Sequence, residues 1–532
     1  MINLISLPVA NFNMPQIENC IIKNLLKEHQ IDSHHFDLTQ SFLNSCLTSK
    51  YIKKHYIKNS KKINQSDKVA INNIDTTIKK LKNKQQIPEN LLDLNMSFQH
   101  VLNFIARENS FKWTSRNLYF KNQITSIEEL LQFSILKETN VFDTAFESNF
   151  ESFNDNDVFY FSIKYAYQMP FAIRFSREIK NRIKNSFIIY GGDYITQIKD
   201  NAKELMEKFA PIDVISLYGN YNNILKTINN QKASDCFVRH NNSIDFLNEH
   251  DSTKKVLELD FVPDFSDLDL NNYLSNIIIV PYYLNYGCYH SKCNFCNRYI
   301  FYKQYHNLNF AKICKNIKQL CESIGVGGIY FIDECVPVDT LVAFANYIIN
   351  EKLNIKWMVE TRFQKGFLYK NIVDKLYQSG LKEISFGLES LSKRILNLMN
   401  KQININESKK ILQNFYINNI CTSVTLMVNY PTETKRELLK TLKFIKKFKY
   451  IHCFGISEFK LFRNSIMCNP IACEYGKNLN ILYKVKNTKD ITAIMSNFYS
   501  DQKIKKYVTI RNKILYRTQY LFLPIKKYSL NI

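Results

Sequence analysis

The sequence predicts an α/β protein built from two domains that each hold a parallel sheet. Short apolar runs, which are typical of buried strands, alternate with helical patterns along most of the chain. Glycine occurs only 12 times in 532 residues and proline only 11 times, which excludes collagen-like and low-complexity chains. Since 45% of the residues are apolar, the chain can bury large cores, and its length fits two to four domains.

The first half of the chain predicts a Rossmann-like parallel α/β domain over residues 1–250. Strands are expected at 2–8, 158–163, 186–190 and 213–217, and helices around 17–29, 172–184 and 195–209. A polar, Lys/Asn-rich insertion at 50–97 interrupts this order as an added helical or mobile segment. Gly191-Gly192 after the third strand lets either a ligand or the next helix approach closely, and the sequence favours neither alternative.

The second half predicts a partial (β/α)6 TIM-like barrel over residues 276–470. An acidic stretch at 251–275 precedes it as a linker, and a basic extension at 471–532 follows it. Strands are expected at 277–283, 328–333, 355–361, 383–388, 422–428 and 453–459, with helices at 310–323, 340–350, 369–379, 392–399, 407–418 and 435–447. Nine of the twelve glycines lie between 287 and 476. Because such barrels place their sites at the carboxyl ends of the strands, we expect the chemistry there.

The net charge of +23 comes mostly from lysines scattered over the whole chain. A basic balance can indicate nucleic acid, an anionic membrane surface or an acidic partner. Coding DNA poor in G and C explains it equally, because such DNA enriches Lys, Asn and Ile and depletes Gly, Ala and Pro. The chain starts without a basic region followed by an apolar one, and no apolar run approaches the length of a membrane span. We therefore expect a cytoplasmic protein without a membrane segment, whose 13 cysteines are reduced.

The strongest local signal is a cysteine cluster directly after the first barrel strand. Cys288, Cys293 and Cys296 follow Gly287 in a C-x4-C-x2-C spacing. Three thiolates from one loop are typical of an iron–sulfur cluster with one iron left open, whereas structural zinc usually needs two close pairs. A zinc site would require a fourth ligand, such as His290 or the more distant Cys335. A chance group of buried cysteines is the remaining alternative.

This loop and the segments after it resemble the radical S-adenosylmethionine (radical SAM) superfamily, and more closely its group with an N-terminal cobalamin (B12)-binding-like domain. The resemblance continues, in family order, through Phe331-Ile332-Asp333-Glu334-Cys335-Val336-Pro337, Gly387-Leu388-Glu389-Ser390, Met399-Asn400-Lys401 and Tyr430-Pro431-Thr432-Glu433-Thr434. It covers about 270–470 well and extends weakly into the first domain. It implies that the three cysteines hold a 4Fe–4S cluster, that S-adenosylmethionine chelates the open iron, and that a reductant such as flavodoxin or ferredoxin supplies an electron.

The resemblance also implies roles for four residues around the cofactor. Phe295 would pack against the adenine, although the same ring can simply anchor the loop in a core. Glu389 would accept hydrogen bonds from the ribose hydroxyls, or else cap a helix or form an ion pair. Asp333 would face the methionine ammonium. Arg362 would pair with the methionine carboxylate, as its planar fork allows, or serve as a surface ion-pair partner.

Several positions depart from the family pattern. Asn285-Tyr286 stands where Ser-Arg is frequent, and Gln402 and Asn429 stand where glycine is usual. Asparagine tolerates the left-handed backbone conformation, so the last change is mild. The first domain has no Asp-x-His-x-x-Gly signature for a cobalt-ligating histidine; Asp32-Ser33-His34 comes nearest but follows the first helix. Cobalamin binding is therefore left open by the sequence.

Three function hypotheses remain. The leading one is a radical SAM enzyme that modifies a precursor peptide or transfers a methyl group. RNA modification is the second, because the segment 471–532 carries twelve Lys and Arg residues with interleaved tyrosines, although no appended RNA-binding domain is recognised. The third is a non-catalytic binding protein with a degenerate site. The sequence assigns no substrate and no residue that touches one.

Overall fold

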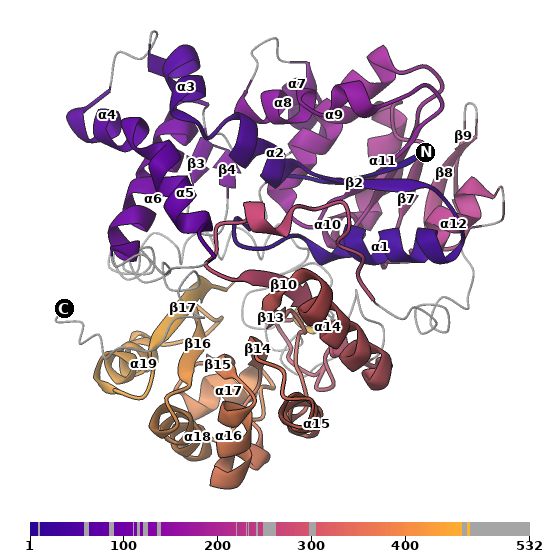
Figure 1. Ribbon diagram of the computed structural model, residues 1–532. Coiled ribbons are helices and arrows are strands. Elements are labelled where there is room, and N and C mark those ends of the chain that lie inside the picture. The colour runs from indigo at the N-terminus through magenta and orange to yellow at the C-terminus, as the bar shows by residue number, and fades with distance from the viewer. Residues whose placement is uncertain are drawn as a thin grey trace. The chain divides into compact units, whose positions relative to one another are not determined.

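The computed structural model of the protein describes residues 1–468 apart from fourteen short stretches. These are residues 9–10, 58–62, 85–89, 110, 114–117, 121–125, 136–139, 220, 230, 232, 241–242, 248–261, 297–304 and 460–464. The chain forms two compact units, Met1–Pro281 and Tyr282–Ile532 (Figure 1). The basic extension expected at 471–532 and the first part of the expected linker, residues 251–261, lie outside the described residues.

The first unit is built on a seven-stranded sheet in the order β2-β1-β5-β6-β7-β8-β9. Its strands are β1 (Ile2–Ser6), β2 (Ser33–Asp37), β5 (Val158–Ser162), β6 (Phe187–Gly191), β7 (Val214–Ser216), β8 (Cys236–His240) and β9 (Ser243–Leu247). Pairing is parallel from β2 to β7, and the hairpin β8–β9 joins antiparallel. The expected Rossmann-like parallel domain is confirmed.

Two parts of this sheet have no counterpart among the expected strands. The sequence Ser-His-His-Phe-Asp of β2 is mostly polar, because β2 is an edge strand that is only partly buried. In the hairpin β8–β9 several side chains are exposed, so it carries little apolar signal. Both segments owe their pairing to neighbours that are distant in the sequence.

Helices surround this sheet and form the insertion. They are α1 (Ile17–Glu28), α2 (Leu38–Ser45), α3 (Ser49–Ile52), α4 (Gln65–Asn72), α5 (Ile74–Lys82), α6 (Leu91–Glu108), α7 (Ile127–Ser134), α8 (Val141–Glu147), α9 (Met169–Arg182), α10 (Asp193–Gln197), α11 (Lys199–Lys208) and α12 (Asn222–Ile228). The small ribbon β3 (Phe111–Trp113) and β4 (Leu118–Phe120) follows α6. The helix expected over 195–209 is divided into α10 and α11 at Ile198. Described residues of the 50–97 insertion are largely helical, as one of its alternatives predicts.

A six-stranded sheet in consecutive order, β10-β13-β14-β15-β16-β17, begins with β10 at the boundary of the two units and continues through the second unit. These strands are Ile278–Tyr282, Val326–Phe331, Lys356–Thr361, Leu381–Glu389, Cys421–Val428 and Cys453–Glu458. They match the six expected strands within about three residues at each end. A short ribbon, β11 (Asn285–Tyr286) with β12 (His306–Asn307), stands apart from this sheet.

Helices separate the strands in the expected alternation. They are α14 (Phe310–Ile324), α15 (Val338–Asn350), α16 (Lys370–Gln378), α17 (Lys393–Leu398), α18 (Ile405–Ile417) and α19 (Lys435–Lys447), and they lie around the outside of the sheet (Figure 1). The partial (β/α)6 barrel is therefore confirmed. Its helix-facing core is aromatic: the Trp357 ring lies 5.4 Å from Phe344 of α15, and the Phe386 ring lies 5.6 Å from Phe415 of α18.

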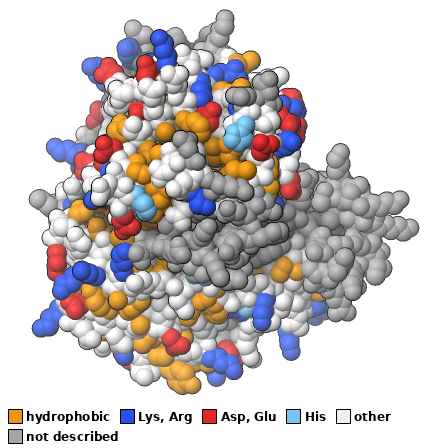
Figure 2. Space-filling model, turned by 90° about the vertical axis from the view of Figure 1, so that its right-hand side faces the viewer, with side chains coloured by type: hydrophobic (Ala, Val, Ile, Leu, Met, Phe, Trp, Pro, Cys, Tyr) orange, Lys and Arg blue, Asp and Glu red, His pale blue; other side chains and the backbone are white. Residues whose placement is uncertain are grey.

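Charged side chains are mixed on the described surface. On the face drawn in Figure 2, Lys and Arg side chains are interspersed with Asp and Glu, and the described side chains there form no continuous basic patch. A search of the described helices finds none with the length and apolarity that a bilayer crossing requires.

Candidate functional site

The cysteine loop begins where β10 ends and is held at its start by Asp333. That residue follows β13, and its two carboxylate oxygens accept the backbone N–H of Leu284 at 3.1 Å, while Oδ1 also accepts that of Asn285 at 2.6 Å. Gly287, with φ of 88°, then turns the chain in the left-handed region directly before Cys288. The neighbouring strand end thus fixes the direction in which the loop leaves the sheet.

The far end of the loop is clamped to the end of α17. The backbone N–H of Asn294 donates to the Met399 carbonyl at 3.0 Å, and its side-chain amide donates to the Leu398 carbonyl at 2.8 Å. His290 donates through Nε2 to the Asn400 carbonyl at 3.1 Å. The Met-Asn-Lys segment therefore acts as a backbone template for the loop.

The three cysteines of the loop are half-buried. The pKa of Cys288 falls to about 6, because the Cys335 thiol and then the N–H groups of Ser291 and His290 donate hydrogen bonds to its sulfur. Burial raises the pKa of Cys293, although the positive charges of Lys401 and Arg362 act in the opposite direction. N–H groups and cations directed at sulfur are what a metal-bound thiolate requires.

The pattern of residues in the loop fits an iron–sulfur cluster better than a single zinc ion. A tetrahedral zinc needs its ligand atoms around one centre at about 2.3 Å. A structural zinc site usually has two close pairs of ligands, whereas three thiols of one loop are typical of an iron–sulfur cluster with one open iron. The cations Lys401 and Arg362 beside Cys293 suit the negative charge of such a cluster.

Cys335 lies directly against the cysteine loop. It forms an isolated β-bridge with Cys288, its side chain is buried, and its sulfur lies 3.7 Å from the Thr361 hydroxyl. The sequence alone names Cys335 only as a distant fourth ligand for zinc, whereas the structure makes its thiol a hydrogen-bond donor to Cys288. The sequence signal that could have predicted this contact is the position of Cys335 just after the second barrel strand.

Two cations and one carboxylate lie beside the loop. The Arg362 guanidinium donates to the Lys401 carbonyl at 2.5 Å, so Arg362 is not the surface residue of the alternative interpretation. Lys401 extends its ammonium to Glu389 Oε1 at 2.9 Å, and both side chains are about 90% buried. Burial alone would lower the pKa of Lys401, but the carboxylate of Glu389 holds it above its usual value. Lys401 has no role in the sequence-based prediction.

Glu389 occupies a strained position at the end of β15. Its φ is 61°, in the left-handed region, and the pairing with β16 shifts between Gly387 and Glu389. A Cβ on Gly387 would lie 2.5 Å from Lys401 Nζ and 3.0 Å from Glu389 Oε1. Glycine is therefore required at 387 to let the ion pair lie against the strand. The ion-pair alternative for Glu389 describes its observed contact, and a ribose contact through Oε2 stays a prediction.

Phe295 has the core contact of its loop-anchoring alternative. Its ring packs beside a core cluster that contains Leu396, Met399 and Tyr430. It is only partly buried, and Lys401 Nζ lies 5.9 Å from the ring centre. The core contact anchors the loop, and the adenine contact stays a prediction.

The Asp333 carboxylate accepts hydrogen bonds from the backbone of the loop. Burial raises the pKa of this carboxyl to about 7, although the N–H groups of Leu284 and Asn285 act to lower it. Contact with a methionine ammonium stays a prediction, and the anchoring of the loop is the interaction that the structure contains.

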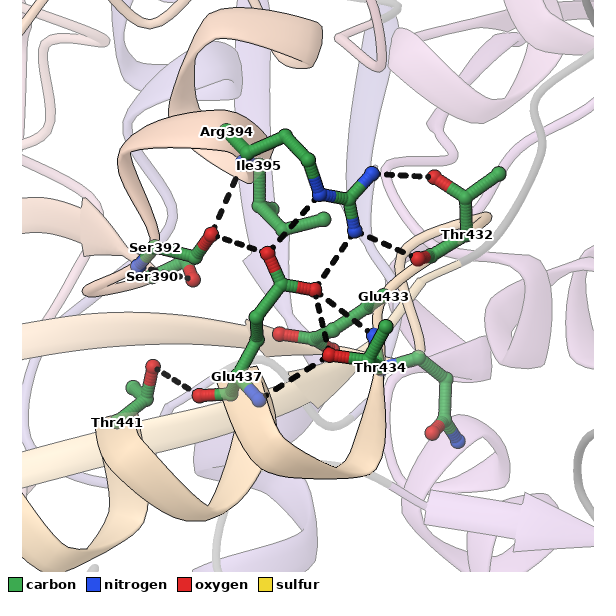
Figure 3. Close-up of polar contacts among 10 residues, drawn as sticks. Ser390, Ser392, Arg394, Ile395, Thr432, Glu433, Thr434, Glu437 and Thr441 are labelled. Carbon is green, nitrogen blue, oxygen red and sulfur yellow. Dashed lines mark hydrogen bonds and ion pairs between the residues drawn. The ribbon is translucent and has the colours of Figure 1, made fainter.

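A second polar network braces the motif around residue 432 against α17 (Figure 3). Arg394 donates to both carboxylate oxygens of Glu437 and, at 2.7 Å, to the Thr432 carbonyl. Glu437 also accepts Ser392 Oγ at 2.6 Å, and Thr434 caps α19 with it in a capping box. Arg394 and these donors hold the pKa of Glu437 well below its usual range. This network keeps the 430–434 loop next to the helix that clamps the cysteine loop.

In the first unit, the turn at Gly191-Gly192 is used for close packing. A Cβ on Gly191 would lie 2.1 Å from the Tyr160 hydroxyl, and one on Gly192, whose φ is 103°, would lie 2.5 Å from the Ile163 carbonyl. These contacts are with β5 and with the residue that follows it, and not with the helix α10 after the turn, so they do not test the helix-packing alternative. They do not test whether a ligand also approaches this edge.

Of the two histidines of β2, His35 lies beside the carboxyl end of β1. It is buried, and its Nε2 is 2.8 Å from the hydroxyl of Ser6, the last residue of that strand. His34 lies 3.6 Å from a carboxylate oxygen of Asp267. Burial lowers the pKa of His35 to about 3, so its ring is neutral. Both rings thus have protein partners within the first unit.

Comparison with known proteins agrees with this geometry. The model of the radical SAM superfamily matches residues 282–445. The chain carries a radical SAM domain. The cysteine loop, Asp333, Arg362, Glu389 and Lys401 all lie within this matched segment.

Curated relatives share this region at low identity. The anaerobic magnesium-protoporphyrin IX monomethyl ester cyclase of Rubrivivax gelatinosus is 24% identical over 34% of this chain and 33% of its own length. The protein of that name from Cereibacter sphaeroides is 23% identical over 49% of this chain and 44% of its own length. The chain thus spans less than half the length of these relatives.

Solved structures share the wider fold. The radical SAM methyltransferase TsrM of Kitasatospora setae, solved with cobalamin and a 4Fe–4S cluster, matches 90% of this chain and 75% of its own, with a TM-score of 0.53 and 11% identity. The cobalamin-dependent radical SAM enzyme OxsB matches 90% of this chain and 55% of its own, with a TM-score of 0.52 and 12% identity. Both matches extend beyond the radical SAM domain, so the two-unit architecture as well as the barrel is shared.

Proposed function

We propose that this protein is a radical SAM enzyme, in which Cys288, Cys293 and Cys296 hold a 4Fe–4S cluster and S-adenosylmethionine binds beside it. The observation that supports this most is the cysteine loop itself, since it is anchored at both ends and donates N–H groups to Cys288. When bound, such a cluster supplies the electron that cleaves the sulfonium of S-adenosylmethionine into methionine and a 5′-deoxyadenosyl radical. The protein contributes position and exclusion of water.

The residues beside the loop are suited to orient S-adenosylmethionine. Arg362 offers its planar fork to the methionine carboxylate, and Glu389 Oε2 is left for a ribose hydroxyl because Oε1 pairs with Lys401. Phe295 offers the exposed part of its ring to the adenine. Asp333 orients the loop and lies near enough to its start to meet the methionine ammonium.

Cobalamin is the third proposed cofactor, and the first unit is its proposed site. The parallel sheet β2-β1-β5-β6-β7 supplies a carboxyl edge of the kind at which such folds bind ligands. We propose that neither His34 nor His35 ligates the cobalt, because His34 lies beside Asp267 and the neutral, buried ring of His35 contacts Ser6. Added hydroxocobalamin that stays with the protein through gel filtration, with the spectrum of a histidine-free cobalt, is the expected result.

The proposed reaction is methyl transfer or the modification of a peptide by hydrogen abstraction, with flavodoxin or ferredoxin as the external reductant. The fold shared with the methyltransferase TsrM is compatible with the first reaction class. At 11% identity this similarity is evidence for the fold only. The two classes leave different products. Hydrogen abstraction yields 5′-deoxyadenosine, whereas methyl transfer also yields S-adenosylhomocysteine.

The direct test is anaerobic reconstitution of the full chain with iron and sulfide. Mössbauer and EPR spectra should show one 4Fe–4S cluster whose EPR signal shifts when S-adenosylmethionine is added. The variant Cys293→Ala should lose this cluster, while the control Cys321→Ala, a half-buried thiol of α14, should keep it. A Cys293→Ala protein with an intact open-site cluster, or a loaded wild type that never forms 5′-deoxyadenosine or S-adenosylhomocysteine with its substrate, would contradict the proposal.

A further inference from the structure

The radical SAM sheet has two chemically different faces. Phe331, Trp357 and Phe386 face the helices, as their ring contacts with α15 and α18 show. Successive residues of a strand point to opposite faces. The other face, called the inner face below, therefore carries Tyr330, Glu360, Ser385, Thr425 and Ser457.

Strand pairing brings the polar residues of the inner face side by side. Glu360 of β14 pairs with Ser385 of β15, and Ser385 pairs with Ser423 of β16. Two residues further along the strands, Gly387 pairs with Thr425, and Thr425 pairs with Gly455. These two rows of the inner face thus carry hydroxyls and glycines beside Glu360, while Met358 and Met427 lie on the same face in the neighbouring rows.

This surface is open, unlike the helix-facing side. Val424 and Leu426 are at most 1% exposed, while Thr425 between them is exposed. Ser457 is also exposed, and a Cβ on Gly455 would meet no atom within 4 Å. Strands that are packed on one side and open with small polar residues on the other leave space for a bound molecule.

Glu360 places a carboxylate in the middle of this surface; Glu383, two residues before Ser385 on the same face, is 4% exposed. Glu360 Oε1 accepts the Tyr330 hydroxyl at 3.0 Å, and within the described part of the chain this is its one polar contact. No described lysine, arginine or histidine neutralises it there. Glu389, by contrast, is paired with Lys401. A half-buried carboxylate with a free oxygen attracts a group that brings positive charge and N–H donors.

We infer that Glu360 on the inner face binds a cationic, N–H-donating group of the substrate, a guanidinium or a protonated amine. The inference rests on the proposed function, because a substrate must lie inside the barrel to meet a radical formed at its strand ends. A substrate portion with an arginine or lysine side chain has this chemistry. Ser385 and Thr425 supply hydroxyls to the remainder of the same portion.

Charge-selective labelling of an introduced thiol tests this site in the full-length, cluster-loaded chain. Ser385→Cys places a thiol next to Glu360 with little change in volume. A cationic and an anionic methanethiosulfonate of similar size are compared, and site-resolved mass spectrometry reports each rate relative to native Cys321, which serves as an internal reference. We expect the cationic reagent to be favoured by roughly tenfold at the introduced thiol, from a charge separation of about 6 Å in a largely aqueous medium.

The substitution Glu360→Gln in the same background should abolish this preference without abolishing labelling. N-acetyl-arginine amide should then protect the thiol more strongly than N-acetyl-citrulline amide, its neutral isostere, and only when Glu360 is present. Equal rates for both reagents, equal protection by both amides, or a thiol that does not react would overturn the inference. Labelling needs no cleavage of S-adenosylmethionine, so this failure is distinguishable from a failure of the proposed enzyme activity.

Discussion

The buried pair of Lys401 and Glu389 gives the sharpest stability prediction. The two groups are 2.9 Å apart, with side-chain exposures of 11% and 9%, at the end of a strand where Glu389 already has a left-handed φ. The change Lys401→Met keeps the length and apolar stem of the side chain and removes its charge. Glu389 then stays buried beside Gly387 without its cation.

Breaking a buried pair by removing one partner costs about 3–5 kcal/mol, chiefly because the other charge is left uncompensated. Removing both charges costs much less. The double variant Lys401→Met/Glu389→Gln should therefore regain about half or more of the loss, with a coupling energy of roughly 1–3 kcal/mol. This non-additivity separates the ion pair from simple loss of packing.

The chain offers a probe for this unit alone. It contains two tryptophans, Trp113 and Trp357. Trp357 is fully buried in the radical SAM unit, where its Nε1–H donates to the Ser379 carbonyl at 3.0 Å. In a Trp113→Phe background, Trp357 fluorescence reports unfolding of the second unit separately, as a chain with two units requires.

Urea unfolding should show a midpoint lowered by about 1 M or more in Lys401→Met, for an m-value of about 3 kcal/mol/M. The double variant should lie between this single variant and the parent. A single variant with the parent's midpoint, or a double variant less stable than the single one, would refute the reasoning.

Three further predictions concern the same unit. Gly380 has φ of 95°, and a Cβ there would lie 2.1 Å from a backbone carbonyl oxygen, whereas Gly325 has φ of 74° and open space around it. Gly380→Ala should therefore lower the free energy of unfolding by clearly more than the roughly 1 kcal/mol expected for Gly325→Ala. Trp357 fluorescence during urea unfolding measures both losses. Burial raises the pKa of Glu433 from about 4.5 to about 7, so the folded state holds this proton after the unfolded state has lost it, and stability falls as pH rises from about 4.5 to 7; urea midpoints between pH 5 and 7.5 should show a smaller loss in Glu433→Gln. Cys335→Ala removes a thiol donor to Cys288 and should lower the reduction potential of the reconstituted cluster by about 20–50 mV in an EPR titration, and an unchanged potential would show that this hydrogen bond is absent in the loaded protein.

Local patterns determined the elements of the radical SAM unit. Each of its six strands is a short apolar run followed by an amphipathic helix, so the period of the sequence and the element agree. The C-x4-C-x2-C spacing is equally local, because all three thiols belong to one loop. Two departures from the family pattern are local as well. Gln402 and Asn429 stand where glycine is usual, and they have φ of 53° and 60°, the left-handed conformation that glycine adopts most easily.

Contacts between distant segments were decided by the tertiary structure. β2 and the hairpin β8–β9 form through pairing with other strands, and nothing in their own composition requires it. Lys401 meets Glu389 because α17 returns the chain to the end of β15, and Cys335 meets Cys288 because two strand ends are neighbours. The sequence by itself determined the class of fold and the cysteine loop, since both depend on nearest neighbours along the chain. The charge partners of the site, and the open carboxylate of Glu360, depend on which strands lie side by side, and only the folded chain specifies that.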